Sequence, residues 1–182
     1  MLNVLAISGS LRSASFNTGL LRAAQELAPA AMTIHLYTGL SAIPPYNQDV
    51  EASGIPESVA ELKAAVAASG ALLIATPEYN YSIPGVLKNA IDWVSRPPAT
   101  TPLKRKPVGI IGATAGNGGT IRAQLALRQC FVFTESYAML KPEFLLAAAQ
   151  EKCNAAGVLT DEATRGKLSA YLEALSTWAA RW

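Results

Sequence analysis

The sequence predicts an α/β fold, with a doubly wound five-stranded parallel sheet and helices on both faces. Residues 71–76 and 108–112 are apolar without alternation, as expected for parallel strands that are covered on both sides. Strand-like runs alternate with helical patterns along the chain, which favours right-handed crossovers between parallel strands. Hydrophobic residues make up 51% of the chain and charged residues 15%, so a disordered chain is excluded.

The expected strands lie near residues 3–8, 32–37, 71–76 and 107–113, with a last one within 136–146. Helices are expected near 17–28, 57–68, 84–95, 120–131 and 161–180. Thr160 is the expected N-cap of the last helix, because acidic residues follow it in the first turn. The segment 38–55, which contains Pro44 and Pro45, is expected to be a long connection that forms one rim of the site.

Length and composition limit the function classes. The 182 residues suit a single domain, residues 1–182, with a substantial core. No apolar stretch approaches the roughly 20 residues that span a bilayer, so no membrane partner is expected. The apolar run at 4–7 is too short for a signal peptide, and a cytoplasmic location is therefore expected.

Charge and metal-binding residue types exclude further partners. The formal net charge is +2 and the longest basic cluster is residues 104–106, so we expect no nucleic-acid partner. Cys130 and Cys153 have no metal-ligand spacing and are expected to be packing residues or inert thiols. His35 is the single histidine, so metal sites and catalytic triads lack their usual side chains.

The turn after the first strand is a candidate phosphate-binding loop. Its glycine, three serines and an arginine precede a helix whose first N–H groups are free to bind an anion. The planar guanidinium of Arg12 suits a phosphate dianion. The loop matches neither the Walker pattern nor the dinucleotide glycine pattern. A serine-rich turn that only caps a helix is the alternative. The candidate residues of this loop are Ser10, Arg12, Ser15, Phe16 and Asn17.

Two later loops follow the third and fourth strands, so all three loops should stand along one sheet edge. The loop at 77–85 offers two tyrosines around an asparagine, which suits a planar heteroaromatic ring. The loop at 114–119 is glycine-rich and brings bare backbone to the same place. The candidate residues of these loops are Pro77, Glu78, Tyr79, Asn80, Tyr81, Ser82 and Gly116. A phosphate at one loop and a flat ring at the others describe a mononucleotide.

Three segments, residues 9–17, 77–93 and 118–129, together resemble the NAD(P)H-dependent FMN reductases, most closely the quinone and chromate reductase branch. The resemblance runs from Val4 to about Leu146. It implies a flavodoxin-like fold, a bound FMN, NADPH or NADH as co-substrate, and ping-pong reduction of quinones and other small-molecule electron acceptors such as chromate, azo compounds or free flavin. The flavin would carry the chemistry, so no catalytic side chain is expected.

Several alternatives stay open at this stage. A flavodoxin-like electron carrier between protein partners has the same fold, although such carriers are typically strongly acidic. A redox-sensing regulator without catalysis is a third possibility. Glu78 is interpreted as an acceptor for backbone amides in preference to a chemical acid. Arg122 and Arg128 would meet either a dinucleotide phosphate or a neighbouring subunit.

A homodimer or homotetramer is expected. The predicted helix at 120–131 combines its two arginines with Ile121, Leu125 and Leu127, a composition typical of interfaces. The alternative is that Ile121 and Leu125 face the sheet core.

Overall fold

A computed structural model describes the whole chain, Met1–Trp182, and confirms the parallel α/β architecture. All strand pairs are parallel, in the order β2-β1-β3-β4-β5, with β6 also paired to β4. This is the strand order of flavodoxin, in which ligands bind where the order reverses, between β1 and β3. The strands are β1 (Leu2–Ser8), β2 (Met32–Tyr37), β3 (Ala71–Ala75), β4 (Pro107–Ala113), β5 (Tyr137–Ala138) and β6 (Phe144–Leu146).

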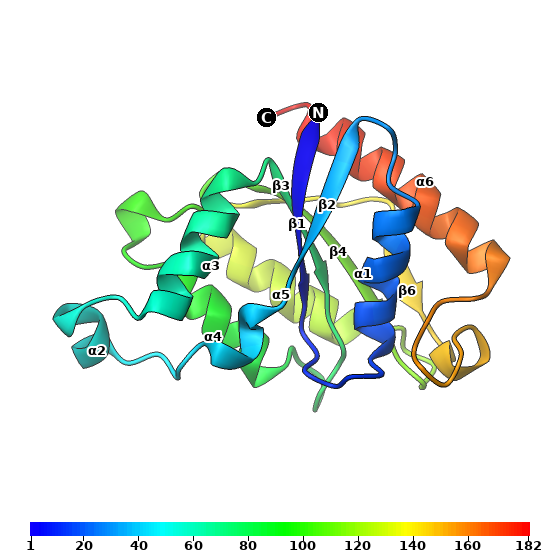
Figure 1. Cartoon of the computed structure of the whole chain (residues 1–182), viewed down its shortest axis with the longest axis horizontal. Helices are drawn as coiled ribbons and strands as arrows, with labels where there is room; N and C mark the ends of the chain where they lie inside the picture. Colours follow the sequence, from blue (N-terminus) through cyan, green and yellow to red (C-terminus); the bar gives the residue numbers. More distant parts are fainter.

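Helices cover both faces of the sheet, as Figure 1 shows. One core cluster joins the sheet to α1 (Phe16–Glu26) and α6 (Glu162–Ala179), and Leu168, Leu172 and Leu175 of α6 are buried in it. The other cluster joins the opposite face to α3 (Glu57–Ala68), α4 (Gly85–Val94) and α5 (Ile121–Phe133). Trp93 and Phe131 are buried there. The two chain ends lie together at the edge opposite the strand carboxyl ends.

The fifth strand position is divided, which the sequence did not predict. β5 pairs with the start of β4 and β6 with its end, while residues 140–143, after the bond from Met139 N to Val108 O, leave the ladder. Pro142 in this segment has no N–H to donate to a ladder. Tyr171 of α6 fills the gap, because its hydroxyl accepts from Ile110 N at 2.7 Å and donates to Ile110 O at 2.9 Å.

One local prediction, the N-cap of the last helix, was wrong. Asp161 is the N-cap of α6, accepting from Thr164 N at 2.8 Å, and Thr160 lies outside the helix. Both residue types cap helices, so the sequence could not choose between neighbours. The expected connection at 38–55 contains a 3-10 turn, Gly39–Ala42, and the short helix α2 (Gln48–Ser53). No helix of the chain is both long and apolar enough to cross a bilayer.

Candidate functional site

The three predicted loops lie together at the carboxyl edge of the sheet. Backbone hydrogen bonds join their starting points: Gly9 N donates to Ala75 O at 2.8 Å, and Thr76 N donates to Ile111 O at 3.0 Å. Gly9 must stay small, because a Cβ there would lie 3.2 Å from the Pro77 ring and 3.1 Å from Leu87. The three loops therefore start from one rigid sheet edge.

Serine hydroxyls shape the first loop. Ser8 Oγ accepts from Ser10 N at 3.3 Å, and Ser10 Oγ accepts from Arg12 N at 3.3 Å. Ser15 caps α1, its hydroxyl accepting from Thr18 N at 3.4 Å. The other N–H groups of the first turn have no intrahelical acceptor and can meet an anion.

A cavity of about 220 Å³ lies against this loop. Its lining includes Arg12 and also Arg22, one turn beyond Thr18 on α1. Tyr37, at the end of β2, also belongs to the lining, but its side chain packs with the core on the α3 and α4 side of the sheet. The lining around the two arginines also includes the hydroxyl residues Ser8, Ser10, Ser13 and Thr18. Guanidinium groups and hydroxyls in this arrangement fit a phosphate monoester such as that of FMN.

Arg22 was missed by sequence reasoning. It follows Thr18 by four residues on the same helix, so it could have been found from the helical period. The Tyr37 side chain lies on the other face of the sheet, where burial, followed by the charge of Glu61, raises the pKa of its hydroxyl.

Arg12, Phe16 and Asn17 have defined contacts of their own. The Arg12 guanidinium lies 5.5 Å from the Phe16 ring centroid and donates to Ala14 O at 2.9 Å. The Asn17 side chain is buried and bonds Ala113, donating to its carbonyl and accepting from its N–H, both at 2.9 Å. Asn17 therefore joins α1 to the end of β4, and its side-chain amide is already occupied.

The second loop makes a tight turn at the same edge. Tyr79 and Ser82 exchange two backbone hydrogen bonds of 3.0 Å. Asn80 and Tyr81 between them have φ of 50° and 67°. Positive φ at both central positions defines a type I′ turn, which suits Asn but is strained for Tyr. The turn leaves both tyrosine side chains exposed, available to a planar ring.

The third loop is tied to the last strand. Thr114 N donates to Leu146 O at 3.0 Å, and Ala148 N donates to Gly116 O at 3.1 Å. Gly119 has φ of 55°, and a Cβ there would lie 2.9 Å from the Leu145 backbone. Gly116 is exposed, and the nearest atom to a Cβ built there is Thr114 Oγ1 at 3.8 Å, so its backbone is accessible to a ligand.

Glu78 connects the second loop to α5. One carboxylate oxygen accepts from Arg122 N at 3.0 Å and Ala123 N at 3.3 Å, and the other accepts from Arg122 Nε at 2.6 Å. Burial raises the pKa of Glu78, but these hydrogen bonds and the Arg122 charge together bring it below its ordinary value. Glu78 is thus an ionised acceptor of backbone amides, as interpreted from the sequence. Arg128 donates to Met139 O at 2.9 Å.

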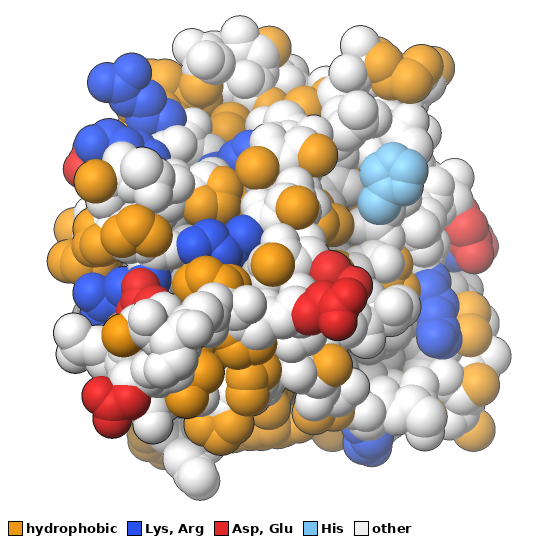
Figure 2. Space-filling view, turned by 60° about the vertical axis from the view of Figure 1, so that its left-hand side comes forward, with side chains coloured by type: hydrophobic (Ala, Val, Ile, Leu, Met, Phe, Trp, Pro, Cys, Tyr) orange, Lys and Arg blue, Asp and Glu red, His pale blue; other side chains and the backbone are white.

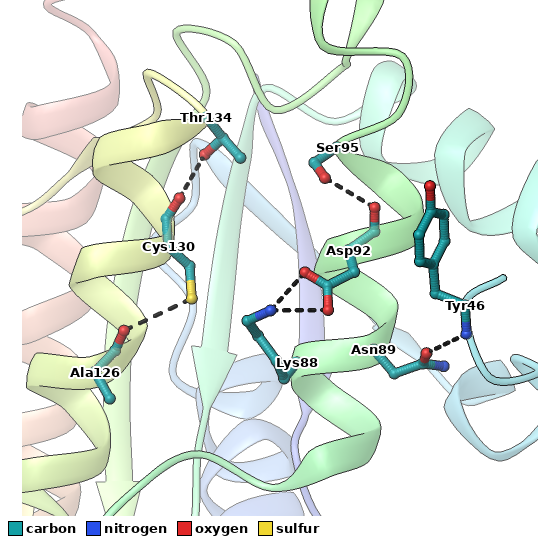
Figure 3. Close-up of polar contacts among 8 residues, drawn as sticks. All are labelled: Tyr46, Lys88, Asn89, Asp92, Ser95, Ala126, Cys130 and Thr134. Carbon is teal, nitrogen blue, oxygen red and sulfur yellow. Dashed lines mark hydrogen bonds and ion pairs between the residues drawn. The ribbon is translucent and has the colours of Figure 1, made fainter. Parts of the chain in front are cut away.

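Residues of α4 hold the connection at 38–55, the expected rim of the site, in place. Asn89 accepts from Tyr46 N at 2.7 Å and donates to Pro44 O at 2.8 Å, and Trp93 Nε1 donates to the same carbonyl at 2.8 Å. Figure 3 shows the Tyr46–Asn89 contact together with the ion pair between Lys88 and Asp92 on the exposed side of α4.

The two cysteines are free. Cys130 on α5 faces α4 across from Lys88, and its thiol lies 3.6 Å from Ala126 O (Figure 3). Burial raises the pKa of both thiols, so neither is a ready thiolate. No group of three or more His, Cys, Asp and Glu side chains is arranged to hold a metal ion.

A cavity of about 600 Å³ lies elsewhere, between β6 and α6. None of the predicted site residues lines it. On the face shown in Figure 2, basic and acidic side chains are interspersed among apolar ones and do not gather by sign. The predicted loops therefore remain the site with a consistent ligand chemistry: an anion cradle beside a flat, partly aromatic surface.

Comparisons with known proteins agree with this chemistry. Residues 2–151 match the family model of NADPH-dependent FMN reductase. An NAD(P)H-dependent FMN reductase from Pseudomonas aeruginosa is 48% identical over 180 residues, covering 99% of this chain and 96% of its own. A quinone reductase from Escherichia coli is 40% identical over 182 residues, with 99% and 96% covered.

A solved structure shows the same fold. The flavoenzyme NAD(P)H:(acceptor) oxidoreductase FerB from Paracoccus denitrificans superposes with a TM-score of 0.90 at 36% identity, covering 100% of this chain and 98% of that one. The family match spans all three loops of the site. The chain therefore belongs to the NADPH-dependent FMN reductase family.

Proposed function

We propose that this protein is an FMN-dependent NAD(P)H oxidoreductase that reduces quinones at the carboxyl edge of its sheet. The observation that carries the proposal is the cavity against the first loop and α1, which is lined by Arg12, Arg22 and the serines of the loop. When bound, FMN supplies the chemistry, taking a hydride from NADPH or NADH and passing two electrons to the acceptor in a ping-pong sequence.

The chain's own residues bind the flavin and orient it. The first-turn N–H groups of α1, with Ser10 and Arg12, would hold the phosphate. The turn at Tyr79–Ser82 and the glycine-rich loop around Gly116 would hold the ring from two sides. Backbone N–H groups of residues 78, 80 and 81 would stabilise negative charge on a reduced ring, because they are fixed before the reaction, whereas that of Tyr79 is already bonded to Ser82 O. Two exposed tyrosines offer flat faces to a planar quinone.

Steady-state kinetics test the proposal. The protein is reconstituted with FMN, and NADPH or NADH oxidation is followed with benzoquinone, free FMN or chromate as acceptor. Parallel double-reciprocal plots against NADPH and quinone would support a ping-pong sequence. Turnover no faster than that of free FMN under the same conditions would contradict the proposal.

The rival function, an electron carrier between proteins, makes a different prediction in the same assay. A carrier would oxidise NADPH only when a reductase and a protein acceptor are added. The net charge of +2 argues against a carrier, because such proteins typically use acidic surfaces.

We also propose that the protein is a homodimer or homotetramer assembled through α5. Ile121 and Leu125 are exposed, so the alternative that they face the core is wrong; Leu127, by contrast, is buried and belongs to the core. Farther along the helix, the side chains of Val132 and Phe133 are 80% and 66% exposed. Large apolar side chains along one exposed stripe are typical of an interface between copies of one chain.

Light scattering at micromolar concentration tests the assembly. We expect the mass of two or four chains, and we expect Val132→Lys to shift it to smaller species because a charge would be buried at the contact. Arg122→Glu is not a clean test, because it would set a second carboxylate against Glu78. A monomeric, fully active wild-type protein would contradict the proposal.

A further inference from the structure

The N-terminus of α5 has no cap from its own sequence. Thr120, at the N-cap position, has φ of 67°, and its side chain makes no capping bond. Its hydroxyl instead accepts from Gln124 Nε2 at 3.2 Å. The Glu78 carboxylate receives the first N–H groups of α5, so the cap comes from the loop proposed to hold the flavin ring.

Arg122 adds a second contact to the same loop. A cation in the first turn of a helix is unfavourable with respect to the helix dipole, and the bond to Glu78 offsets this. The Arg122 guanidinium also lies over the Tyr81 ring, 3.9 Å from its centroid. The Glu78 side chain is only 10% exposed, whereas that of Arg122 is 48% exposed. One arginine thus contacts the loop both before its turn, at Glu78, and within it, at Tyr81.

The turn between those contacts is strained. Asn80 and Tyr81 both have positive φ, and a left-handed tyrosine persists only where its surroundings hold it. The contacts made by Glu78 before the turn and by Tyr81 within it come from α5, 44 residues away. The two backbone hydrogen bonds within the turn do not by themselves fix its position relative to the rest of the site.

We infer that Glu78 and Arg122 are positioning residues that hold the Asn80–Tyr81 turn in place for the flavin ring. The inference rests on the proposed location of the ring at this loop. Neither side chain needs to contact the flavin: Glu78 is turned to α5, and Arg122 acts through Glu78 and Tyr81.

The inference predicts where along the flavin the effect is felt. The contacts hold the ring end of the site and not the phosphate end. Loss of the Glu78 charge should lower the affinities for FMN and for riboflavin by the same factor, about tenfold for one charge-assisted hydrogen bond. The visible absorption bands of bound flavin should shift, because the ring surroundings change.

The test uses flavin titrations of the apoprotein, followed by fluorescence quenching, for wild type, Glu78→Gln, Arg122→Lys, Arg122→Met and the double variant Glu78→Gln/Arg122→Met. Lysine keeps the positive charge near Glu78 and Tyr81, so we expect Arg122→Lys to lose less flavin affinity than Arg122→Met. The double variant should lose less than the product of the two single losses, because both residues act in one network. The matched control is Asp92→Asn, which removes the exposed Lys88 pair, also 2.6 Å long, on α4 (Figure 3).

Clear results would overturn the inference. Unchanged affinity for both flavins in Glu78→Gln, or a loss confined to FMN, would show that Glu78 does not position the ring. An equal loss in Asp92→Asn would show a general effect of removing an ion pair. If Glu78→Gln does not fold, Tyr81→Leu tests the same contact from the exposed side, and unchanged affinities there would overturn the inference. Wild-type apoprotein that binds neither flavin would contradict the proposed function itself.

Discussion

Tyr171→Phe tests the account of the divided fifth strand. The Tyr171 side chain is buried, and its hydroxyl serves both the N–H and the carbonyl of Ile110 in the middle of β4. Removing the hydroxyl leaves two buried backbone groups unpaired and changes almost no volume. Each unpaired group costs about 1–3 kcal/mol, and we expect a total loss of about 2–4 kcal/mol, since partial relaxation reduces the sum.

Urea unfolding followed by circular dichroism measures this loss. For a chain of this size, the expected loss corresponds to a fall in Tm of roughly 4–16 °C. Tyr137→Phe is the matched control, because the Tyr137 ring stacks on Trp182 at 3.9 Å while its hydroxyl makes no hydrogen bond within the protein. A Tyr171→Phe variant within about 0.5 kcal/mol of wild type, the range of ordinary surface substitutions, would refute the reasoning.

Three further outcomes are expected. Arg12→Ala should lower the affinity for FMN roughly ten- to hundredfold and the affinity for riboflavin much less, since only FMN has a phosphate. Equal losses of affinity in a titration would show that Arg12 does not bind the phosphate. The difference in free energy of unfolding between wild type and Glu78→Gln should be constant near neutral pH and shrink as pH falls below about 4.5. The reason is that the pKa of Glu78 is lowered in the folded protein, so the stability that its carboxylate gives is lost when it is protonated. A difference that stays unchanged to pH 3 in urea unfolding would contradict this. Cys130→Ser and Cys153→Ser should each keep most quinone reductase activity, because neither thiol lies in the site; a variant that binds FMN normally without turnover would show that a thiol takes part.

The elements with continuous apolar runs were predictable from sequence. β3 and β4 are buried along their whole length, so their hydrophobic patterns left little ambiguity. The divided strand was not predictable, because it depends on a hydroxyl from α6 meeting Ile110 across the sheet. Local propensity carries no information about such a contact.

The candidate site, too, could be predicted from the sequence only in part. The loops could be found because turn chemistry and strand order place them at one edge. The hydrogen-bond partners of Asn17 and Glu78 could not be found from the sequence, since they lie 96 and 44 residues away in it. The Asn17 side chain joins α1 to β4, and the expectation that Asn17 binds the cofactor stays a prediction. A cytoplasmic location and the roles of the individual loop residues stay predictions.

The central claim is that this fold and its three loops carry out two-electron transfer from NAD(P)H to quinones through FMN. The most direct measurement is anaerobic stopped-flow absorbance of the reconstituted protein, mixed first with one equivalent of NADPH and then with benzoquinone. We expect the flavin absorbance to bleach in the first step and return in the second, each faster than with free FMN. A protein that retains FMN but shows no bleaching with either NADPH or NADH would contradict the claim.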